Sequence, residues 1–271
     1  MAHSVVIIGN GFDLNLGMKT SYRDYIRSPF FRDCLNIGHQ LFDYLDEQTN
    51  IENWIDIEKE LAIFSKEKNT SDSFIKDYFL LCETLKNYLS SLDLLLINQE
   101  TEAYKFITKS FNENTIILNF NYTDSVNYIL AQAGFSSELT SENIKHVHGS
   151  IKENDIIFGV DDSAAINPDD TFLYKSTNNN YNGRRVRSSL EDFSNLIVFG
   201  HSLGESDHMY FKSSISDLKH MDENLDKKMT LYYYEDSGKF QLYKQLHKLT
   251  QNDVAKLKDN IHFEEFDTSL L

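Results

Sequence analysis

The sequence has few cysteines, an excess of acidic over basic residues and no long apolar run. Cys34 and Cys82 are the only cysteines and form no Cys-x-x-Cys pair, which argues against a disulfide framework or a cysteine zinc module and favours a reducing cytoplasm. Lys and Arg number 26 against 42 Asp and Glu, and the net charge of −16 disfavours broad contact with nucleic-acid phosphates. No uncharged apolar stretch reaches the roughly 18 residues of a membrane helix. We therefore expect a cytoplasmic protein with neither a membrane nor a nucleic-acid partner.

Short β-prone runs are distributed along the 271 residues, and helical patterns separate most of them. Parallel strands need long crossover connections, usually helical, so this alternation predicts an α/β fold with a mainly parallel sheet flanked by helices. We expect one domain over residues 1–271, a length sufficient for a sizeable core. The expected strands are residues 5–9, 115–120, 145–148, 156–160, 196–200, 229–234 and 261–266.

Residues 30–112 carry no strand signal, and we expect a large helical insertion there. Apolar residues recur in this region at the spacing of one helix face, and Ser71 is placed to cap the longer of two helices. The first stripe is Trp54, Ile57, Leu61 and Phe64, and the second is Ile75, Tyr78, Cys82, Leu85, Leu89, Leu92 and Leu96. The stripes fit core packing better than a partner-binding zipper.

Residues 161–183 are rich in Asp and Asn, a composition that resists regular structure. Long loops of this kind often serve as lids or binding loops. Arg184, Arg185 and Arg187 follow, and this basic run suits either an anion site or a solvated turn.

The apolar run of residues 5–8 breaks directly into Gly9, Asn10 and Gly11. Such a run suits a strand buried on both faces, and the glycines let the backbone turn sharply and approach a ligand. A helix starting near Gly11 would point free N–H groups at an anion. The pattern is typical of a nucleotide-phosphate site, although an ordinary glycine turn would read the same way.

Two further strand ends carry polar side chains. Asn121 follows the run at 116–120, and its amide suits a ribose hydroxyl or a water, or else closes an Asx turn. His148, followed by Gly149, is a candidate general base, or a hydrogen-bonded structural histidine. Ligands of open α/β sheets bind at the carboxyl ends of strands, so both residues are candidates for one site.

The segment Gly-His-Ser-Leu-Gly at 200–204 admits two interpretations. As a Gly-x-Ser-x-Gly elbow it would make Ser202 the nucleophile of a serine hydrolase. The acid would then be Asp222 or Asp226 and the histidine His247 or His262. Alternatively, the segment is a second ligand-lining turn, in which Ser202 and nearby backbone groups hold a sugar or phosphate.

Four blocks that together span nearly the whole chain resemble the AbiH family of bacterial abortive-infection proteins. They are Ile-Ile-Gly-Asn-Gly-Phe-Asp-Leu at 7–14, Leu-Asn-Phe-Asn-Tyr-Thr at 118–123, His-Val-His-Gly-Ser at 146–150 and Gly-His-Ser-Leu-Gly-Glu-Ser-Asp at 200–207. The resemblance implies phage resistance, in which an infected cell stops growing or dies before the phage spreads. The same blocks are more distantly similar to the sirtuin and SIR2-like superfamily, which implies a Rossmann-like fold that binds NAD.

The SIR2-like resemblance implies a role for each block. Gly9, Asn10 and Gly11 would lie against the cofactor phosphates, Asn121 near the nicotinamide ribose, and His148 would be the base. Gly200 and Ser202 would contact the cofactor.

Three departures from the SIR2-like pattern matter. Asp13 stands where a serine is usual, and its carboxylate would repel a pyrophosphate unless it faces a ribose or caps the helix. Thr123 replaces an expected aspartate, with Asp124 one place late. The zinc cysteines of protein deacylases are missing.

Taken together, these observations predict an anti-phage effector with NAD as ligand or substrate and no metal. The expected reaction is hydrolysis of NAD to nicotinamide and ADP-ribose. A serine hydrolase using Ser202 and a non-catalytic nucleotide sensor are the alternative functions. The partners that we consider are a second copy of the chain and a phage-derived trigger.

Overall fold

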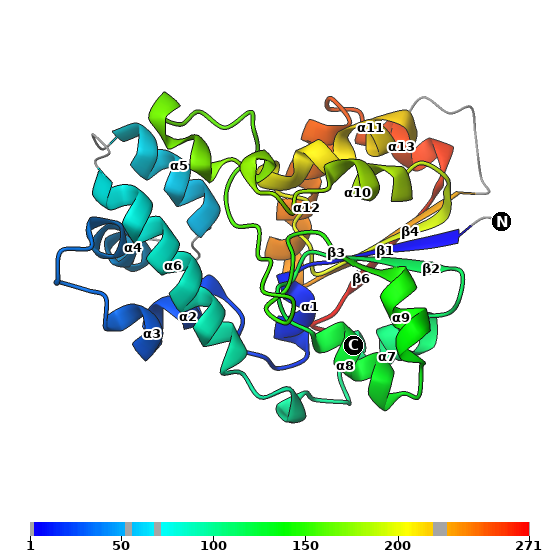
Figure 1. The fold of residues 1–271 in the computed structure, drawn as a ribbon. Helices are drawn as coiled ribbons and strands as arrows, with labels where there is room; N and C mark the ends of the chain where they lie inside the picture. Colours follow the sequence, from blue (N-terminus) through cyan, green and yellow to red (C-terminus); the bar gives the residue numbers. More distant parts are fainter. Residues whose placement is uncertain (1–2, 52–55, 68–71, 219–226, 271) are drawn as a thin grey trace.

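Six parallel strands form one sheet in the computed structural model, which describes residues 3–51, 56–67, 72–218 and 227–270 (Figure 1). Neighbouring strands pair in the order β3-β2-β1-β4-β5-β6, and every pair is parallel. The predicted mainly parallel α/β fold is confirmed. The strands are β1 (His3–Ile8), β2 (Thr115–Asn119), β3 (Ile144–His146), β4 (Phe193–Phe199), β5 (Lys228–Tyr233) and β6 (His262–Asp267).

Helices cover both faces of this sheet. Alternate residues of a strand point to opposite sides, so a strand with apolar residues throughout has apolar side chains to bury on both faces. In β1, Val5 and Ile7 pack in a core with residues of α10, α11, α12 and α13. Val6 and Ile8 pack instead with residues of α1, α7 and α8. The central strands are therefore buried on both sides, as their continuous apolar runs predict. The helices of these layers are α1 (Asn10–Asn15), α7 (Glu102–Ser110), α8 (Ser125–Gln132), α9 (Ser137–Asn143), α10 (Gly183–Ser189), α11 (His208–Leu218), α12 (Glu235–Leu249) and α13 (Val254–Asn260).

A separate group of helices, here called the helical layer, lies beside the sheet domain and comes from the chain between β1 and β2 (Figure 1). It consists of α2 (Tyr22–Arg27), α3 (Pro29–Arg32), α4 (Gln40–Ile51), α5 (Ile57–Glu67) and α6 (Asp72–Ser90). Ile57, Leu61 and Phe64 share one core with the apolar face of α6. Trp54 and the predicted N-cap Ser71 lie outside the described residues. The division of the chain into one domain with an insertion stays a prediction.

The predicted strand at residues 156–160 is wrong. Ile157, Phe158 and Val160 are buried as expected, but none of them lies in a sheet strand, and Phe158 and Val160 pack in the core of the helical layer. Their backbone bonds go elsewhere: Ile157 N donates to the His148 carbonyl at 2.7 Å, and Val160 N to that of Leu173 at 2.9 Å. Apolar side chains alone do not distinguish these two kinds of burial.

The Asp- and Asn-rich segment 161–183 forms a long loop, as predicted from its composition. It contains only two short 3-10 turns before α10, η2 (Pro168–Leu173) and η3 (Lys175–Thr177). An isolated parallel bridge between Val160 and Tyr174 anchors its middle. Within the described ranges, no helix is long and apolar enough to cross a membrane.

Candidate functional site

A cavity of about 330 Å³ opens at the carboxyl ends of β1, β2 and β4. In the observed strand order, β2 and β3 lie on one side of β1 and β4 to β6 lie on the other, so the winding of the sheet reverses between β1 and β4. Ligands of open α/β sheets bind at such a switch point. The turns after these strands form one wall. The helical layer forms the opposite wall, with Tyr22, Glu58, Leu85 and Leu89. The volume of the cavity lies at the lower end of the range of small-molecule sites.

All eight predicted site residues belong either to this cavity wall or to its turns. Gly9, Asn10, Gly11 and Asp13 come from the β1–α1 turn and the first turn of α1, and Asn121 follows β2. His148 follows β3, and Gly200 and Ser202 follow β4. The structure therefore brings the four sequence blocks together, while their chemical roles remain predictions.

The glycines of the β1–α1 turn allow two turns to pack backbone against backbone. Gly11 N donates to the Gly200 carbonyl at 2.8 Å. A Cβ on Gly11 would lie 2.7 Å from Gly200 Cα, and one on Gly200 would lie 2.2 Å from Phe12 N. Gly200 also has φ of +64°, which favours glycine. Because the Gly11 N–H already has a partner, it is not available to a ligand phosphate.

Asn121 bridges the first two strand ends. Its Nδ2 donates to the Gly9 carbonyl at 3.1 Å, and its backbone N donates to Asn119 Oδ1 at 3.0 Å. The predicted Asx-type geometry is thus supplied by Asn119, two residues earlier. Gly9 takes one of the two protons of the Asn121 amide nitrogen, and the Asn121 side chain also hydrogen-bonds Asp13. A water or hydroxyl can donate to the amide oxygen, Oδ1.

Asp13 is fully buried and accepts two short hydrogen bonds from the β2–α8 turn. Thr123 Oγ1 donates to one carboxylate oxygen at 2.5 Å and Ser125 Oγ to the other at 2.6 Å. Burial raises the pKa of Asp13 to about 6, although both hydroxyls favour the charged form. Asp13 does not cap α1, whose N-cap is Gly9 without a side-chain bond. Asp124, which stands one place after the position of the expected aspartate, pairs with Lys152 and is not among the residues of the cavity wall.

Asp207 joins two histidines at the inner end of the cavity. Its Oδ1 lies 3.0 Å from His148 Nε2, and its Oδ2 lies 3.3 Å from His201 Nε2. Leu203 N donates to His201 Nδ1 at 2.9 Å, so the proton of neutral His201 must sit on Nε2 and point to Asp207. An Asp–His pair of this kind can orient an imidazole as a general base.

A buried lysine completes this cluster. Lys175 Nζ lies 2.9 Å from Asp207 Oδ1, 3.1 Å from Glu58 Oε2 and 3.3 Å from both the Ser206 carbonyl oxygen and His148 Nε2. Lys175 is 1% exposed. Glu58 belongs to α5, Lys175 to the loop 161–183 and Asp207 to the segment after β4, so the cluster links the helical layer to the sheet.

The charges of the cluster follow from burial and contact. Burial and the Lys175 ammonium lower the pKa of His148 to about 4, so the imidazole is neutral at pH 7. Burial alone would raise the pKa of Asp207, but Lys175 and His148 hold it well below its usual range. Burial raises the pKa of Glu58 to about 7 despite Lys175. Although burial opposes it, the two carboxylates keep the pKa of Lys175 above its ordinary value.

The geometry around Ser202 does not assemble the hydrolase elbow from the described histidines. Ser202 is exposed, and the left-handed backbone of its turn is at Gly200 and Leu203. His262 begins β6, at the sheet edge opposite to the carboxyl ends, and His247 is exposed on α12. Asp222 and Asp226 lie outside the described residues.

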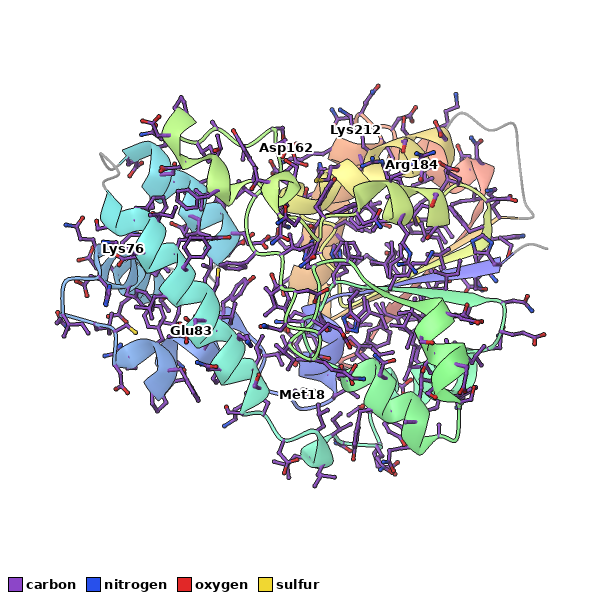
Figure 2. All side chains as sticks on the ribbon, in the orientation of Figure 1. Met18, Lys76, Glu83, Asp162, Arg184 and Lys212 are labelled. Atoms are coloured by element: carbon purple, nitrogen blue, oxygen red, sulfur yellow. The ribbon has the colours of Figure 1, made fainter. Side chains whose placement is uncertain are left out.

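The arginine run lies away from the cavity. Arg184 and Arg185 are exposed on α10, and Figure 2 shows Arg184 on the side of the molecule away from Lys76 and Glu83 of the helical layer. None of the three arginines is among the residues of the cavity wall.

Sequence reasoning missed Lys175, Glu58 and Asp207 as members of the site. Asp207 stands within the fourth block, so its position after a strand was a usable signal. Lys175 and Glu58 gave none, because they are 117 residues apart and meet only through packing of α5 against the loop.

The fold and site define a Rossmann-like α/β protein with a ligand-sized cavity at its topological switch point. Residues 5–226 match the family model described as bacteriophage abortive infection AbiH, and the chain belongs to this family. The predicted family is confirmed, and membership implies an anti-phage role in abortive infection. No curated protein matches the chain.

Proposed function

We propose that this abortive-infection protein binds NAD or a related nucleotide in the switch-point cavity and hydrolyses its nicotinamide glycosidic bond. The observation that carries the proposal is the 3.0 Å contact between His148 Nε2 and Asp207 Oδ1, in the same cavity wall as Asn121 and Asp13. A base for water, an amide acceptor and a carboxylate are the groups that such a hydrolysis uses. The SIR2-like resemblance of the four blocks supports the choice of NAD.

The reaction proceeds by replacement of nicotinamide with water. The bond between the ribose carbon and the pyridinium nitrogen breaks, and its electron pair neutralises the ring. Water forms the new bond to that carbon and gives a proton to His148, while Asn121 Oδ1 orients the water or a ribose hydroxyl. The ribose develops oxocarbenium character, which the Asp13 carboxylate stabilises electrostatically.

The test follows free nicotinamide after the purified protein is incubated with NAD, with and without extract from phage-infected cells. We expect release by the wild type and a loss of about 10²–10⁴-fold in His148→Ala, because general-base catalysis contributes that much. Asn121→Ala should also lose activity. His247→Ala, on exposed α12, is the matched control and should behave as the wild type.

A protein that neither binds NAD nor releases nicotinamide in either condition contradicts the proposal. Tight binding without turnover contradicts hydrolysis and identifies a nucleotide sensor, the alternative that the same cavity allows.

A further inference from the structure

Oxygen atoms can accept all three protons of the Lys175 ammonium. An ammonium has three donors, and three oxygens surround this one: Asp207 Oδ1, Glu58 Oε2 and the Ser206 carbonyl oxygen. His148 Nε2 is a fourth neighbour at 3.3 Å. The ammonium is therefore satisfied without a bond to Nε2, and we assign Nε2 no proton from Lys175.

His148 Nε2 must therefore be a donor. It lies 3.0 Å from Asp207 Oδ1, and an ionised carboxylate can only accept. The neutral imidazole then carries its proton on Nε2, which leaves the lone pair on Nδ1.

We propose that Lys175 is a positioning residue for the candidate base. Lys175 donates to the oxygen atoms of the cluster, and its positive charge keeps His148 neutral. The proton of His148 then stays on Nε2, and Nδ1 is the basic nitrogen. The inference deepens the proposed function and rests on it for its catalytic meaning, whereas the tautomer itself is a property of the protein without NAD.

The groups that face His148 support this arrangement. They are Lys175 from the long loop, Asp207 and His201 from the turn after β4, and the rings of Tyr122 and Tyr210. Lys175 and His201 disfavour a second proton on the imidazole, and Asp207 favours one. Removing the lysine leaves the carboxylates as the dominant charges, so the imidazole should gain a proton more easily.

The backbone holds Lys175 in place. Lys175 N donates to the Val160 carbonyl at 2.9 Å, next to the bridge between Val160 and Tyr174. The loop is also tied to α5, where Ser65 Oγ donates to Asp170 at 2.6 Å. Glu58 and Lys175 thus come from two segments that pack as one unit against Asp207.

His201 provides an internal reference. A backbone N–H from Leu203 sets its tautomer, so that tautomer does not depend on Lys175. The two histidines share Asp207 but differ in what fixes them.

The experiment measures the imidazole ¹⁵N chemical shifts of the protein without ligand across a pH titration, with signals assigned by His148→Gln and His201→Gln. In the wild type at pH 7 we expect both residues as neutral Nε2–H tautomers. A His148 that is an imidazolium, or that carries its proton on Nδ1, overturns the proposal without any variant of Lys175.

The variant arm compares Lys175→Met, Lys175→Arg and Glu58→Gln. In Lys175→Met the protonated fraction of His148 at pH 6 should rise at least about tenfold, which corresponds to one pH unit in its pKa. Lys175→Arg should restore the wild-type state, and His201 should keep its tautomer in all variants. An unchanged His148 titration in a folded Lys175→Met protein overturns the proposal.

These results are independent of NAD turnover. If the expected tautomer is found but nicotinamide is never released, the positioning role stands and the proposed hydrolysis fails. If nicotinamide is released while His148 shows the other tautomer, the reverse holds.

Discussion

The backbone nitrogen of Gly11 donates a hydrogen bond to the carbonyl oxygen of Gly200, and the two residues pack without side chains between them. This contact joins the turn after β1 to the turn after β4, at the point where the cavity opens. The glycines of the β1–α1 turn therefore serve the close packing of two turns.

Substitution of Gly11 by alanine should destabilise the fold. The new Cβ would lie 2.7 Å from Gly200 Cα and 2.9 Å from its carbonyl oxygen, so backbone must move. We expect the free energy of unfolding in urea to fall by about 1–3 kcal/mol, as for overpacked cores. The control is Gly238→Ala in α12, where the Cβ would meet Tyr233 at 3.9 Å and helix propensity favours alanine. Equal stability of the two variants would contradict the packing role.

Asp13 should make the stability fall as the pH rises from about 4 to 6. Its pKa is raised from 3.8 to about 6, so the folded state binds the proton more tightly than the unfolded state. This proton adds about 3 kcal/mol to the free energy of unfolding. The full amount is present at a pH below the pKa of the unfolded state, and it is lost as the pH rises through the pKa of the folded state. Urea unfolding at several pH values should show a flatter profile for Asp13→Asn than for the wild type. The exposed Asp192→Asn should leave the profile unchanged, and an unaltered slope in Asp13→Asn would refute the assignment.

The cavity should prefer the oxidised, cationic form of the dinucleotide. Asp13, Asp56, Glu58 and Asp207 belong to its wall, which among the described residues includes neither lysine nor arginine. Carboxylates attract a pyridinium ring through space, and a neutral ring of similar shape gains nothing from them. Calorimetry should give at least about tenfold tighter binding of NAD⁺ than of NADH, a difference of about 1.4 kcal/mol. Glu58→Gln should narrow the ratio, and equal or tighter binding of NADH would contradict this charge argument.

Lys175 and Glu58 should be coupled in stability. Lys175→Met leaves two buried carboxylates without their cation, and loss of one partner of a buried ion pair costs about 3–5 kcal/mol. Glu58→Gln should cost less, because Asp207 still pairs with the ammonium. In a double-mutant cycle measured by urea unfolding, the double variant should be more stable than the sum of the single losses. Additive losses would mean that the pair does not interact.

The sequence predicted which turns meet at the cavity, but it did not predict the buried cation beside them. Parallel strands present their carboxyl ends at one edge whatever their order, so Gly9, Asn121, His148 and Gly200 could be brought together before the strand order was known. Lys175 could not, because a lysine in an Asn-rich loop has the pattern of a solvated residue. Only the packing of that loop against α5 makes it a buried cation.

The wrong prediction of a strand at residues 156–160 also results from long-range packing. Phe158 and Val160 are apolar because they pack in the core of the helical layer, a long-range contact that leaves no period in the local sequence. Local patterns report burial, but they do not report which element provides it.

The strand order also separates the part of the chain that forms the cavity wall from the part that only supports it. No described residue after Asp207 belongs to the cavity wall, yet β5 pairs with β4 from Asn195 to Phe199 and so supports the turn that carries Gly200. The last part of the chain can therefore change its surface and its loops without altering ligand chemistry, provided that β5 keeps its partner.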